Sequence, residues 1–243
     1  MPENVFMSIV IPMYNEEANI ASTINELSEY LKAKDFSSEV ILIDDGSKDN
    51  TVERAKESKS ELKNLRVIES FPNGGKGYVI KKAVLEARGD NIMFMDADSS
   101  VSIKELDKFI PLLKDEEEIY VASRRIPGAE VTIPVIREIL GRIYILISKL
   151  LLGIRVNDIN CGFKIFKHEA AKKVFYRQIM NDWSFDAELL FLSGKYGYGI
   201  KEIPIKWEYK DTSKVRPLKD GVGSFMSLIK IRLNDLFGKY KEV

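Results

Sequence analysis

Two aspartates separated by a single residue, Asp96 and Asp98, follow a short apolar run at residues 92–95. Carboxylates with this spacing, just beyond a buried strand, can both reach one hard cation, and Mg²⁺ or Mn²⁺ prefers such oxygen ligands. A cation held there keeps positions open for phosphate oxygens and would neutralise a diphosphate as it leaves. A solvated acidic turn has the same pattern, so the other polar residues must decide between the two.

A second acidic pair, Asp44 and Asp45, follows the apolar run at residues 40–43. An aspartate at such a turn can accept hydrogen bonds from the N–H groups of a nucleotide base. The alternative is a cap for the helix that follows, but Asp49 or Asn50 supplies such a cap without two further aspartates.

Three glycines surround Lys76 in the segment 73–77, directly before a predicted helix. The spacing differs from that of a P-loop, so a P-loop nucleotidase is not expected. Glycines let the backbone pass close to a bound nucleotide, with Lys76 beside it. A simple glycine-rich turn is the alternative.

Arg124, after the predicted strand at residues 120–122, and Arg137 offer cations for phosphate groups, which arginine holds in a bidentate way. Each could equally be a solvated surface residue. Asp186 lies between aromatic residues, where it could contact sugar hydroxyls or act as a base, although an aspartate also favours a helix N-terminus. The single histidine, His168, is not expected to be catalytic, which excludes Ser-His-Asp and Cys-His arrangements.

The elements that must position these residues alternate along the chain. Apolar runs alternate with segments of helical spacing, which is typical of βαβ units and a mostly parallel sheet that binds ligands at its carboxyl edge. We therefore predict an α/β, Rossmann-like fold with helices on both faces, as a single domain over residues 1–243. The expected strands are residues 6–12, 40–43, 65–68, 92–95 and 120–122, and the expected helices are residues 17–31, 51–58, 77–87 and 103–113.

Bulk composition excludes several classes of protein. The 243 residues include 37 basic and 37 acidic ones, so no global charge indicates nucleic acid as a partner. One cysteine, Cys161, excludes an internal disulfide framework and agrees with a reducing compartment. We find neither the pattern of a signal peptide nor an uncharged apolar stretch of about 18 residues that would indicate a transmembrane helix. A cytoplasmic protein is expected.

Residues 131–154 are rich in apolar side chains. At about 100° per residue, Glu138, Arg142 and Lys149 fall in a narrow stripe, and the remaining surface is mostly Ile, Leu, Val and Tyr. Such an amphipathic helix can lie in a membrane interface, or it can be packed on the core. Residues 131–154 and 222–240 are our candidate membrane-interface helices.

Taken in order, these motifs resemble glycosyltransferase family 2, inverting enzymes with the GT-A fold. The matching segments are residues 11–17 (IPMYNEE), 44–47 (DDGS), 73–77 (NGGKG) and 96–98 (DAD). Residues 123–124, 158–164 and 213–214 resemble the branch of dolichyl-phosphate hexosyltransferases, which act on polyprenyl phosphates. Residues 183–190 (WSFDAELL) and 202–207 (EIPIKW) are more similar to its glucosyl than to its mannosyl members.

The resemblance implies roles for individual residues. The residues that the resemblance implies in nucleotide-sugar binding are Pro12, Tyr14, Glu16, Asp45, Asp96, Asp98 and Lys214. Our predicted binding residues also include Asn15, Asp44, Lys76 and Ala97, which lie in the same motifs. The implied metal site, for Mg²⁺ or Mn²⁺, consists of Asp96 and Asp98 with Ser100 nearby. The implied catalytic residues are Asp96, Asp98, Arg124 and Arg137, with the two arginines on the acceptor phosphate, and Asp186 joins our predicted catalytic residues from its place between aromatic residues.

The implied reaction moves a hexose, with inversion, from a nucleotide-diphosphate sugar to a polyprenyl phosphate. UDP-glucose is the favoured donor, and the enzyme would sit peripherally on the cytoplasmic face of a membrane. GDP-mannose remains an alternative donor. A soluble enzyme that extends a glycan, with Asp186 as the base, is an alternative too, and so are a nucleotidyltransferase and an inactive nucleotide-sugar sensor.

Overall fold

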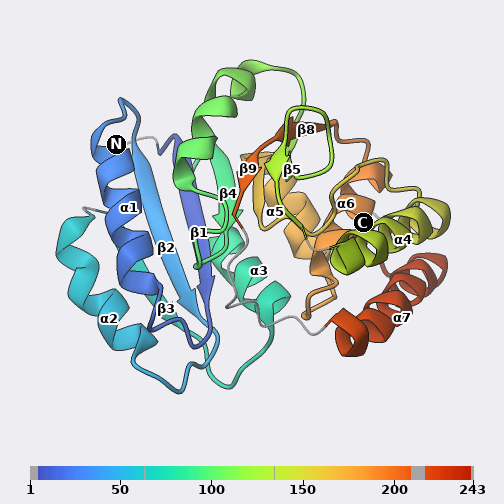
Figure 1. Ribbon diagram of the computed structural model, residues 1–243, viewed down its shortest axis with the longest axis horizontal. Coiled ribbons are helices and arrows are strands. Elements are labelled where there is room, and N and C mark those ends of the chain that lie inside the picture. Colours follow the sequence, from blue (N-terminus) through green and yellow to red (C-terminus); the bar gives the residue numbers. More distant parts are fainter. Residues whose placement is uncertain (1–4, 63, 134, 209–216, 242–243) are drawn as a thin grey trace.

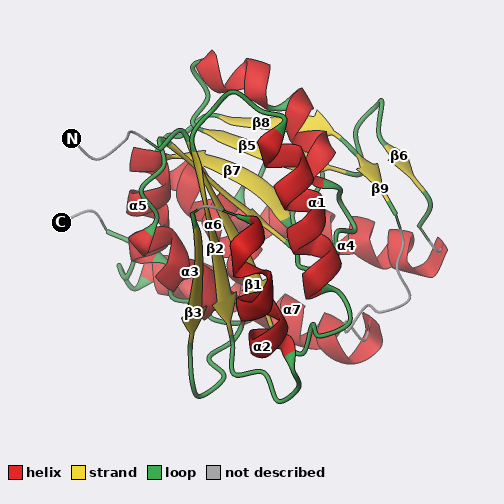
Figure 2. Cartoon of the chain, turned by 90° about the vertical axis from the view of Figure 1, so that its left-hand side faces the viewer, coloured by secondary structure: helices red, strands yellow, loops and turns green. Residues whose placement is uncertain are grey.

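The computed structural model describes residues 5–62, 64–133, 135–208 and 217–241. Its central sheet has seven strands in the order β3-β2-β1-β4-β7-β5-β8, with helices on both faces, and a separate small sheet pairs β6 with β9 (Figures 1 and 2). The strands are β1 (Met7–Met13), β2 (Ser38–Asp44), β3 (Leu65–Glu69), β4 (Asn91–Met95), β5 (Ile119–Ser123), β6 (Glu130–Val131), β7 (Phe163–Lys167), β8 (Ile200–Pro204) and β9 (Lys206–Trp207). The helices are α1 (Ile20–Lys32), α2 (Thr51–Glu57), α3 (Lys76–Glu86), α4 (Val135–Leu152), α5 (His168–Arg177), α6 (Phe185–Lys195) and α7 (Pro217–Leu236), and a short 3₁₀ helix, η1 (Ser58–Glu61), follows α2.

The sheet divides the hydrophobic core in two. Successive side chains of a strand point to opposite faces, so β1 directs Ile9 and Ile11 to one core and Val10 to the other. The first core is closed by α1, and the second by α3, α5 and α6. Both faces of the sheet are therefore covered, which explains why its strands are almost continuously apolar.

The direction of β7 determines what reaches the carboxyl edge of the sheet. β7 runs antiparallel to both of its neighbours, β4 and β5, whereas the other neighbouring pairs of the central sheet are parallel. The carboxyl ends of β1, β2, β4 and β5 therefore share one edge with the beginning of β7. The prediction of a mostly parallel sheet covered on both faces is confirmed.

The prediction of one α-helix over residues 103–113 is wrong. This segment forms two 3₁₀ helices, η2 (Ile103–Lys108) and η3 (Ile110–Lys114). Pro111 lies in the first turn of η3, where proline is tolerated. In a single α-helix over residues 103–113 it would be interior, where it lacks the N–H donor and clashes with the carbonyl four residues earlier. A single α-helix therefore cannot run through this segment without a break.

Helices α4 and α7 lie side by side at one end of the molecule (Figure 1). On α4, Tyr144 and Ile145 are buried, while apolar side chains at helical spacing on both helices are exposed. This outer apolar stripe consists of Ile136, Ile139, Ile143, Leu146 and Leu150 on α4 and Met226, Ile229, Leu233 and Leu236 on α7. One side of α4 is thus packed on the core and another side is apolar and exposed. Within the described ranges, no helix has the length and apolar character needed to cross a membrane.

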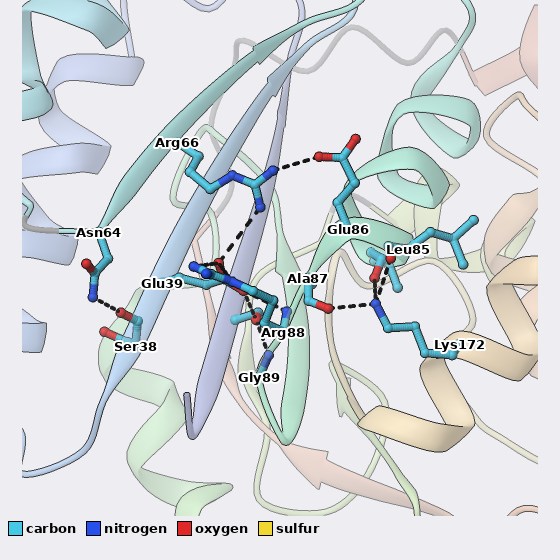
Figure 3. A network of polar contacts seen from close by, with 12 residues as sticks. Ser38, Glu39, Asn64, Arg66, Leu85, Glu86, Ala87, Arg88, Gly89 and Lys172 are labelled. Atoms are coloured by element: carbon cyan, nitrogen blue, oxygen red, sulfur yellow. Dashed lines mark hydrogen bonds and ion pairs between the residues drawn. The ribbon is translucent and has the colours of Figure 1, made fainter. Parts of the chain in front are cut away.

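A polar network lies at the edge of the sheet opposite the carboxyl ends (Figure 3). The side chain of Glu39 is fully buried and accepts hydrogen bonds from Ser8 Oγ and from Arg88 N, both at 2.7 Å, and its second oxygen pairs with the Arg88 guanidinium at 3.0 Å. Burial would raise the Glu39 pKa, but these donors outweigh burial and hold the pKa below its ordinary value. Beside the network, Lys172 donates to three carbonyls at the end of α3.

Replacing Glu39 with Gln should lower the free energy of unfolding near pH 7 by about 2 kcal/mol, because the amide loses charge-assisted bonds and turns an NH₂ group toward a donor. The native pKa lies below the ordinary value of 4.5, so the stabilisation is complete above pH 4.5 and is lost as the pH falls through the native pKa. Denaturant unfolding across this range measures the effect. A difference between wild type and variant that persists in acid would contradict it.

Candidate active site at the carboxyl ends of the strands

Polar residues follow four strands of the central sheet at its carboxyl edge. Tyr14 follows β1, Asp45 follows β2, Asp96 follows β4 and Arg124 follows β5. Because these strands run in the same direction, residues from four separate stretches of the sequence meet at one edge. This is the arrangement that the alternating sequence pattern predicts.

The turn after β1 lies at this edge of the sheet. Pro12 lies within β1, and the next turn contains Asn15, whose φ is 52°. The N–H of Asn15 donates to Ser47 Oγ at 2.9 Å, which joins this turn to the turn after β2. Tyr14 is 37% exposed, and the carbonyl of Glu16 accepts from the start of α1.

Asp44 shapes the turn after β2. Its carboxylate accepts from the N–H of Gly46 at 3.0 Å and from the N–H of Ser47 at 2.9 Å. Gly46 has a φ of 73°, a conformation that side chains other than glycine rarely adopt. The predicted contact of Asp44 with a nucleotide stays a prediction, while its observed partners are in its own turn.

Asp45 ties the end of β2 to the glycine segment 73–77. Its carboxylate accepts from Gly74 N at 2.7 Å and from Gly75 N at 3.0 Å, and its carbonyl accepts from the amide of Asn73 at 2.7 Å. Burial outweighs these bonds and raises the Asp45 pKa. The buried Asp45 therefore fixes the backbone immediately before α3.

Lys76 is the first residue of α3 and reaches the end of β4. Its Nζ lies 2.5 Å from Asp96 Oδ1 and 5.0 Å from the centre of the Trp183 ring. Burial would lower the Lys76 pKa, but the carboxylates of Asp96 and Asp186 outweigh burial and raise it. The structure thus places a charged ammonium against one of the predicted metal ligands.

The Asp96 carboxylate lies directly against the backbone of Gly162. A Cβ atom at residue 162 would lie 2.7 Å from Asp96 Oδ1 and closer still to Oδ2. Gly162 immediately precedes β7, so the contact depends on the antiparallel pairing of β7 with β4. The local sequence pattern assigns no role to Gly162, because that pairing joins segments far apart in the chain.

Asp98 and Ser100 lie in the tight turn that follows. Asp98 Oδ1 accepts from Ser100 N at 2.8 Å, and the Ala97 carbonyl accepts from Thr23 Oγ1 at 2.7 Å. Asp96 and Asp98 offer the carboxylate oxygens that a hard divalent cation prefers. No cluster of three or more His, Cys, Asp or Glu suited to a metal occurs in the described part of the chain. A cation held here would therefore take further ligands from water or a substrate phosphate, as Mg²⁺ usually does.

Arg124 is held by a carboxylate that the predicted site did not include. Its Nε and Nη2 donate to Asp158 at 2.7 and 2.9 Å, and the Trp207 ring centre lies 5.5 Å from the guanidinium. Arg125 pairs with Asp158 at 3.5 Å and with Glu138 of α4 at 3.2 Å. Burial would raise the Asp158 pKa, but the arginines hold it below its ordinary value. Asp158 could have been included from the sequence, because it lies in the segment 158–164 that resembles the dolichyl-phosphate branch of the family.

Asp186 is buried and forms an ion pair with Lys164 of β7. Lys164 is itself fully buried and also donates to the Cys161 carbonyl at 2.7 Å. Burial raises the Asp186 pKa and outweighs the opposing charges of Lys164 and Lys76. The predicted site did not include Lys164, although a lysine inside an apolar strand is a signal that a partner is needed.

Two predicted residues fall outside the side chains that the structure describes. Lys214 lies outside the described residues, and only the backbone of Arg137, within α4, is described. Their roles at the diphosphate and at the acceptor phosphate stay predictions.

Residues 8–175 match the sequence profile of the family described as Glycosyl transferase family 2. This chain belongs to that family. The matched region runs from β1 into α5 and includes the four polar strand ends and the beginning of β7. The prediction that the chain is a family 2 glycosyltransferase is confirmed.

The chain is similar over nearly its whole length to dolichyl-phosphate beta-glucosyltransferases. It is 28% identical to the one from Dictyostelium discoideum, in an alignment that covers 98% of this chain and 77% of the relative. It is 31% identical to the one from Homo sapiens, with 97% and 77% covered. The predicted resemblance to this branch of the family is confirmed.

A solved structure of glucosyl-3-phosphoglycerate synthase from Mycobacterium tuberculosis, in complex with Mn²⁺, UDP and glucosyl-3-phosphoglycerate, has a TM-score of 0.69 to this chain. The sequences are 20% identical, and the match covers 95% of this chain and 79% of the other. At this identity the likeness establishes the fold and not the function. The predicted GT-A fold is confirmed.

Replacing Gly162 with Ala should lower the rate of sugar transfer by about 100-fold, because the methyl group displaces the Asp96 carboxylate and small misplacements at a reacting centre are costly. Transfer assays together with circular dichroism measure activity and folding. Gly194→Ala is the matched control, since nothing lies within 4 Å of a Cβ at that position of α6. A Gly162→Ala enzyme with wild-type turnover would show that the placement of Asp96 is unimportant.

Proposed function

We propose that this chain, as a single catalytic domain, transfers glucose from UDP-glucose to a polyprenyl phosphate with inversion at the anomeric carbon. The observation that carries the proposal is the carboxyl edge of the sheet, where Asp96 and Asp98 lie with Lys76 and Arg124. Such an edge suits two anionic reactants. The names of the relatives, which describe glucosyl transfer and dolichyl phosphate, support the sugar and the acceptor. The UDP bound in the solved neighbour supports uracil as the nucleotide base of the donor.

The donor would lie against the ends of β1, β2 and β4. Asp96 and Asp98, with Ser100 nearby, fit Mg²⁺ or Mn²⁺, and the Mn²⁺ bound with UDP in the solved neighbour supports such an ion. When bound, the ion would neutralise charge on the diphosphate. Lys76 would add an ammonium group beside Asp96. Asp45 and the turn after β1 would face the nucleoside. Lys214 is proposed as a further cation for the diphosphate.

The acceptor phosphate would be held by Arg124, with Arg137 as the second arginine. Asp158 holds the Arg124 guanidinium in a bidentate pair, so its orientation is set before the acceptor arrives. A phosphate with a second pKa of about 6 is already largely anionic near neutrality, so its oxygen can attack without a dedicated base. Catalysis then rests on positioning and charge stabilisation. Asp186 would serve as a base only for a hydroxyl acceptor, and its observed partner is Lys164.

With Mn²⁺ and a polyprenyl phosphate, the protein should move labelled glucose from UDP-glucose into the lipid phase. Asp98→Asn should lower this transfer by about 100-fold or more, because charge stabilisation of the leaving diphosphate is lost. Asp35→Asn, at an exposed position after α1, is the control and should behave as wild type. Partitioning of the label into organic solvent measures the reaction.

The same assay distinguishes the alternatives. Faster transfer from GDP-mannose would replace the proposed donor. Transfer to a glycan without lipid phosphate would replace the proposed acceptor, and pyrophosphate release from a nucleoside triphosphate would indicate a nucleotidyltransferase. Metal-dependent binding without turnover would indicate a sensor.

We further propose that the outer apolar stripe of α4 and α7 rests on the cytoplasmic face of a membrane, so that the chain is attached peripherally. A stripe of this kind buries its apolar side chains at the boundary of the lipid headgroups. Helix α4, which carries part of the stripe, contacts the residue after Arg124, since Arg125 pairs with Glu138 of α4. A lipid-linked phosphate could then reach the site without leaving its bilayer.

Replacing Leu150 with Glu should weaken binding to phospholipid vesicles by about tenfold or more, since a buried leucine contributes roughly 1.5–3 kcal/mol. Leu150 is 77% exposed and belongs to the stripe, whereas Tyr176 of α5 is 68% exposed and does not. Tyr176→Glu is therefore the control. Co-sedimentation measures binding, and equal binding of Leu150→Glu and wild type would remove the stripe as the attachment surface.

A further inference from the structure

Glu188 of α6 is a buried carboxylate outside the site described so far. Its two oxygens accept from the N–H of Ile179 at 3.0 Å, from the N–H of Met180 at 2.8 Å and from the hydroxyl of Tyr240. Burial raises the Glu188 pKa despite these donors. A glutamine offers one oxygen where this carboxylate offers two, so the three donors match a carboxylate and not an amide.

The segment that Glu188 holds is the support for the first turn of α3. The Asn181 carbonyl accepts from Gly77 N at 2.8 Å and from Tyr78 N at 3.3 Å, and the Gln178 amide donates to the Gly77 carbonyl at 2.9 Å. These N–H groups have no partner within their own helix, so the Asn181 carbonyl satisfies donors that α3 leaves open. Segment 178–181 and the start of α3 are thereby joined through backbone bonds.

The fit between the two segments leaves no room for a side chain. A Cβ atom at Gly75 would lie 2.5 Å from the Asn181 carbonyl oxygen, and one at Gly77 would lie 2.7 Å from the Met180 carbonyl oxygen. Lys76 stands between these two glycines. A shift of segment 178–181 would therefore be transmitted to the backbone of Lys76, because closely packed atoms move together.

Tyr240 anchors this arrangement from the end of the described chain. Its side chain is fully buried, its ring centre lies 6.0 Å from that of Phe191, and its carbonyl accepts from the Tyr196 hydroxyl at 3.2 Å. Tyr240 follows α7, one of the two helices with the outer apolar stripe. A chain of contacts thus runs from the end of α7 through Glu188 and Asn181 to Lys76.

We propose that Glu188 and Tyr240 are positioning residues for the donor site. Together they hold segment 178–181 so that the Asn181 carbonyl fixes Gly77 and places the Lys76 ammonium against Asp96. Neither residue touches the donor in this arrangement. The effect on the donor rests on the proposed function, in which Lys76 faces the diphosphate.

Tyr240→Phe tests the proposal, because it removes the hydroxyl and keeps the buried ring. Hydrogen exchange of the peptide that contains Gly77 and Tyr78 should become faster, since the bonds to Asn181 O loosen. The KM for UDP-glucose should rise about 5- to 10-fold, the equivalent of one hydrogen bond, while the KM for the lipid phosphate stays unchanged. In a Lys76→Met background the effect on the donor KM should vanish, because residues that act through one another are not additive.

Tyr120→Phe is the matched control. Tyr120 is also fully buried and donates its hydroxyl to the Leu112 carbonyl at 2.6 Å, in the other core. It should lose comparable thermal stability without changing either the exchange at Gly77 and Tyr78 or the donor KM.

The exchange measurement separates the two proposals. Unchanged exchange at Gly77 and Tyr78 in Tyr240→Phe overturns the positioning role, whatever the donor is. An equal rise of the donor KM with and without Lys76 also overturns it. Faster exchange in a protein that transfers no sugar from UDP-glucose would support the positioning role and contradict the proposed function.

Discussion

The ion pair between Lys76 and Asp96 joins the first turn of α3 to the end of β4, and the donor side of the site is arranged around it. Asp45 accepts from the loop before Lys76, the Asn181 carbonyl accepts from the residues after it, and Gly162 leaves room for Asp96. The Lys76 ammonium is mostly buried and loses solvation, and such a charge is tolerated where a partner is held in place. The tight glycine loop and the absence of a side chain at residue 162 follow from the need to hold this pair.

Ion pairs between a cation and a carboxylate recur along the carboxyl edge of the sheet. Cation–carboxylate pairs at this edge include Lys76–Asp96, Lys164–Asp186 and Arg124–Asp158. In the proposed function, the first and third pairs keep an ammonium and a guanidinium group in place before a reactant arrives, so less order has to be created when two anionic substrates bind. β7 has a central part in this, since it carries Lys164 and follows the segment that contains Asp158 and Gly162. The antiparallel strand and the segment before it thus bring neighbours to two strand ends, Asp96 after β4 and Arg124 after β5, and to Asp186 of α6.

Arg125 connects the acceptor side of the site to α4. Arg125 forms ion pairs with Asp158 and Glu138, and its guanidinium lies against Gly141, where a Cβ atom would collide with it. The small residue lets α4 approach the end of β5 closely. In the proposed function, this contact keeps the outer apolar stripe, and with it the lipid surface, at a set distance from Arg124. The charged edge and the apolar stripe can then serve one reaction between a water-soluble donor and a lipid acceptor.

Strands β1 to β5, the polar residues that follow them and their meeting at one edge could be predicted from the sequence, because apolar period and turn residues are local and parallel strand ends share an edge. The expected strands did not include β6 to β9. The sequence also indicated the Asp96–Asp98 pair, the amphipathic character of residues 135–152 and the family. The break at Pro111 was not predicted, although proline is a local signal for it. Three contacts follow from the tertiary packing alone: Lys164 pairs with Asp186, Asp158 holds Arg124, and the Asp96 carboxylate lies against Gly162. The same is true of the bonds from Glu188 to segment 178–181. These contacts depend on how β7 pairs and how α4, α6 and α7 pack. The hydrophobic periodicity of a segment is a local property, so it does not specify which distant segment will lie beside it.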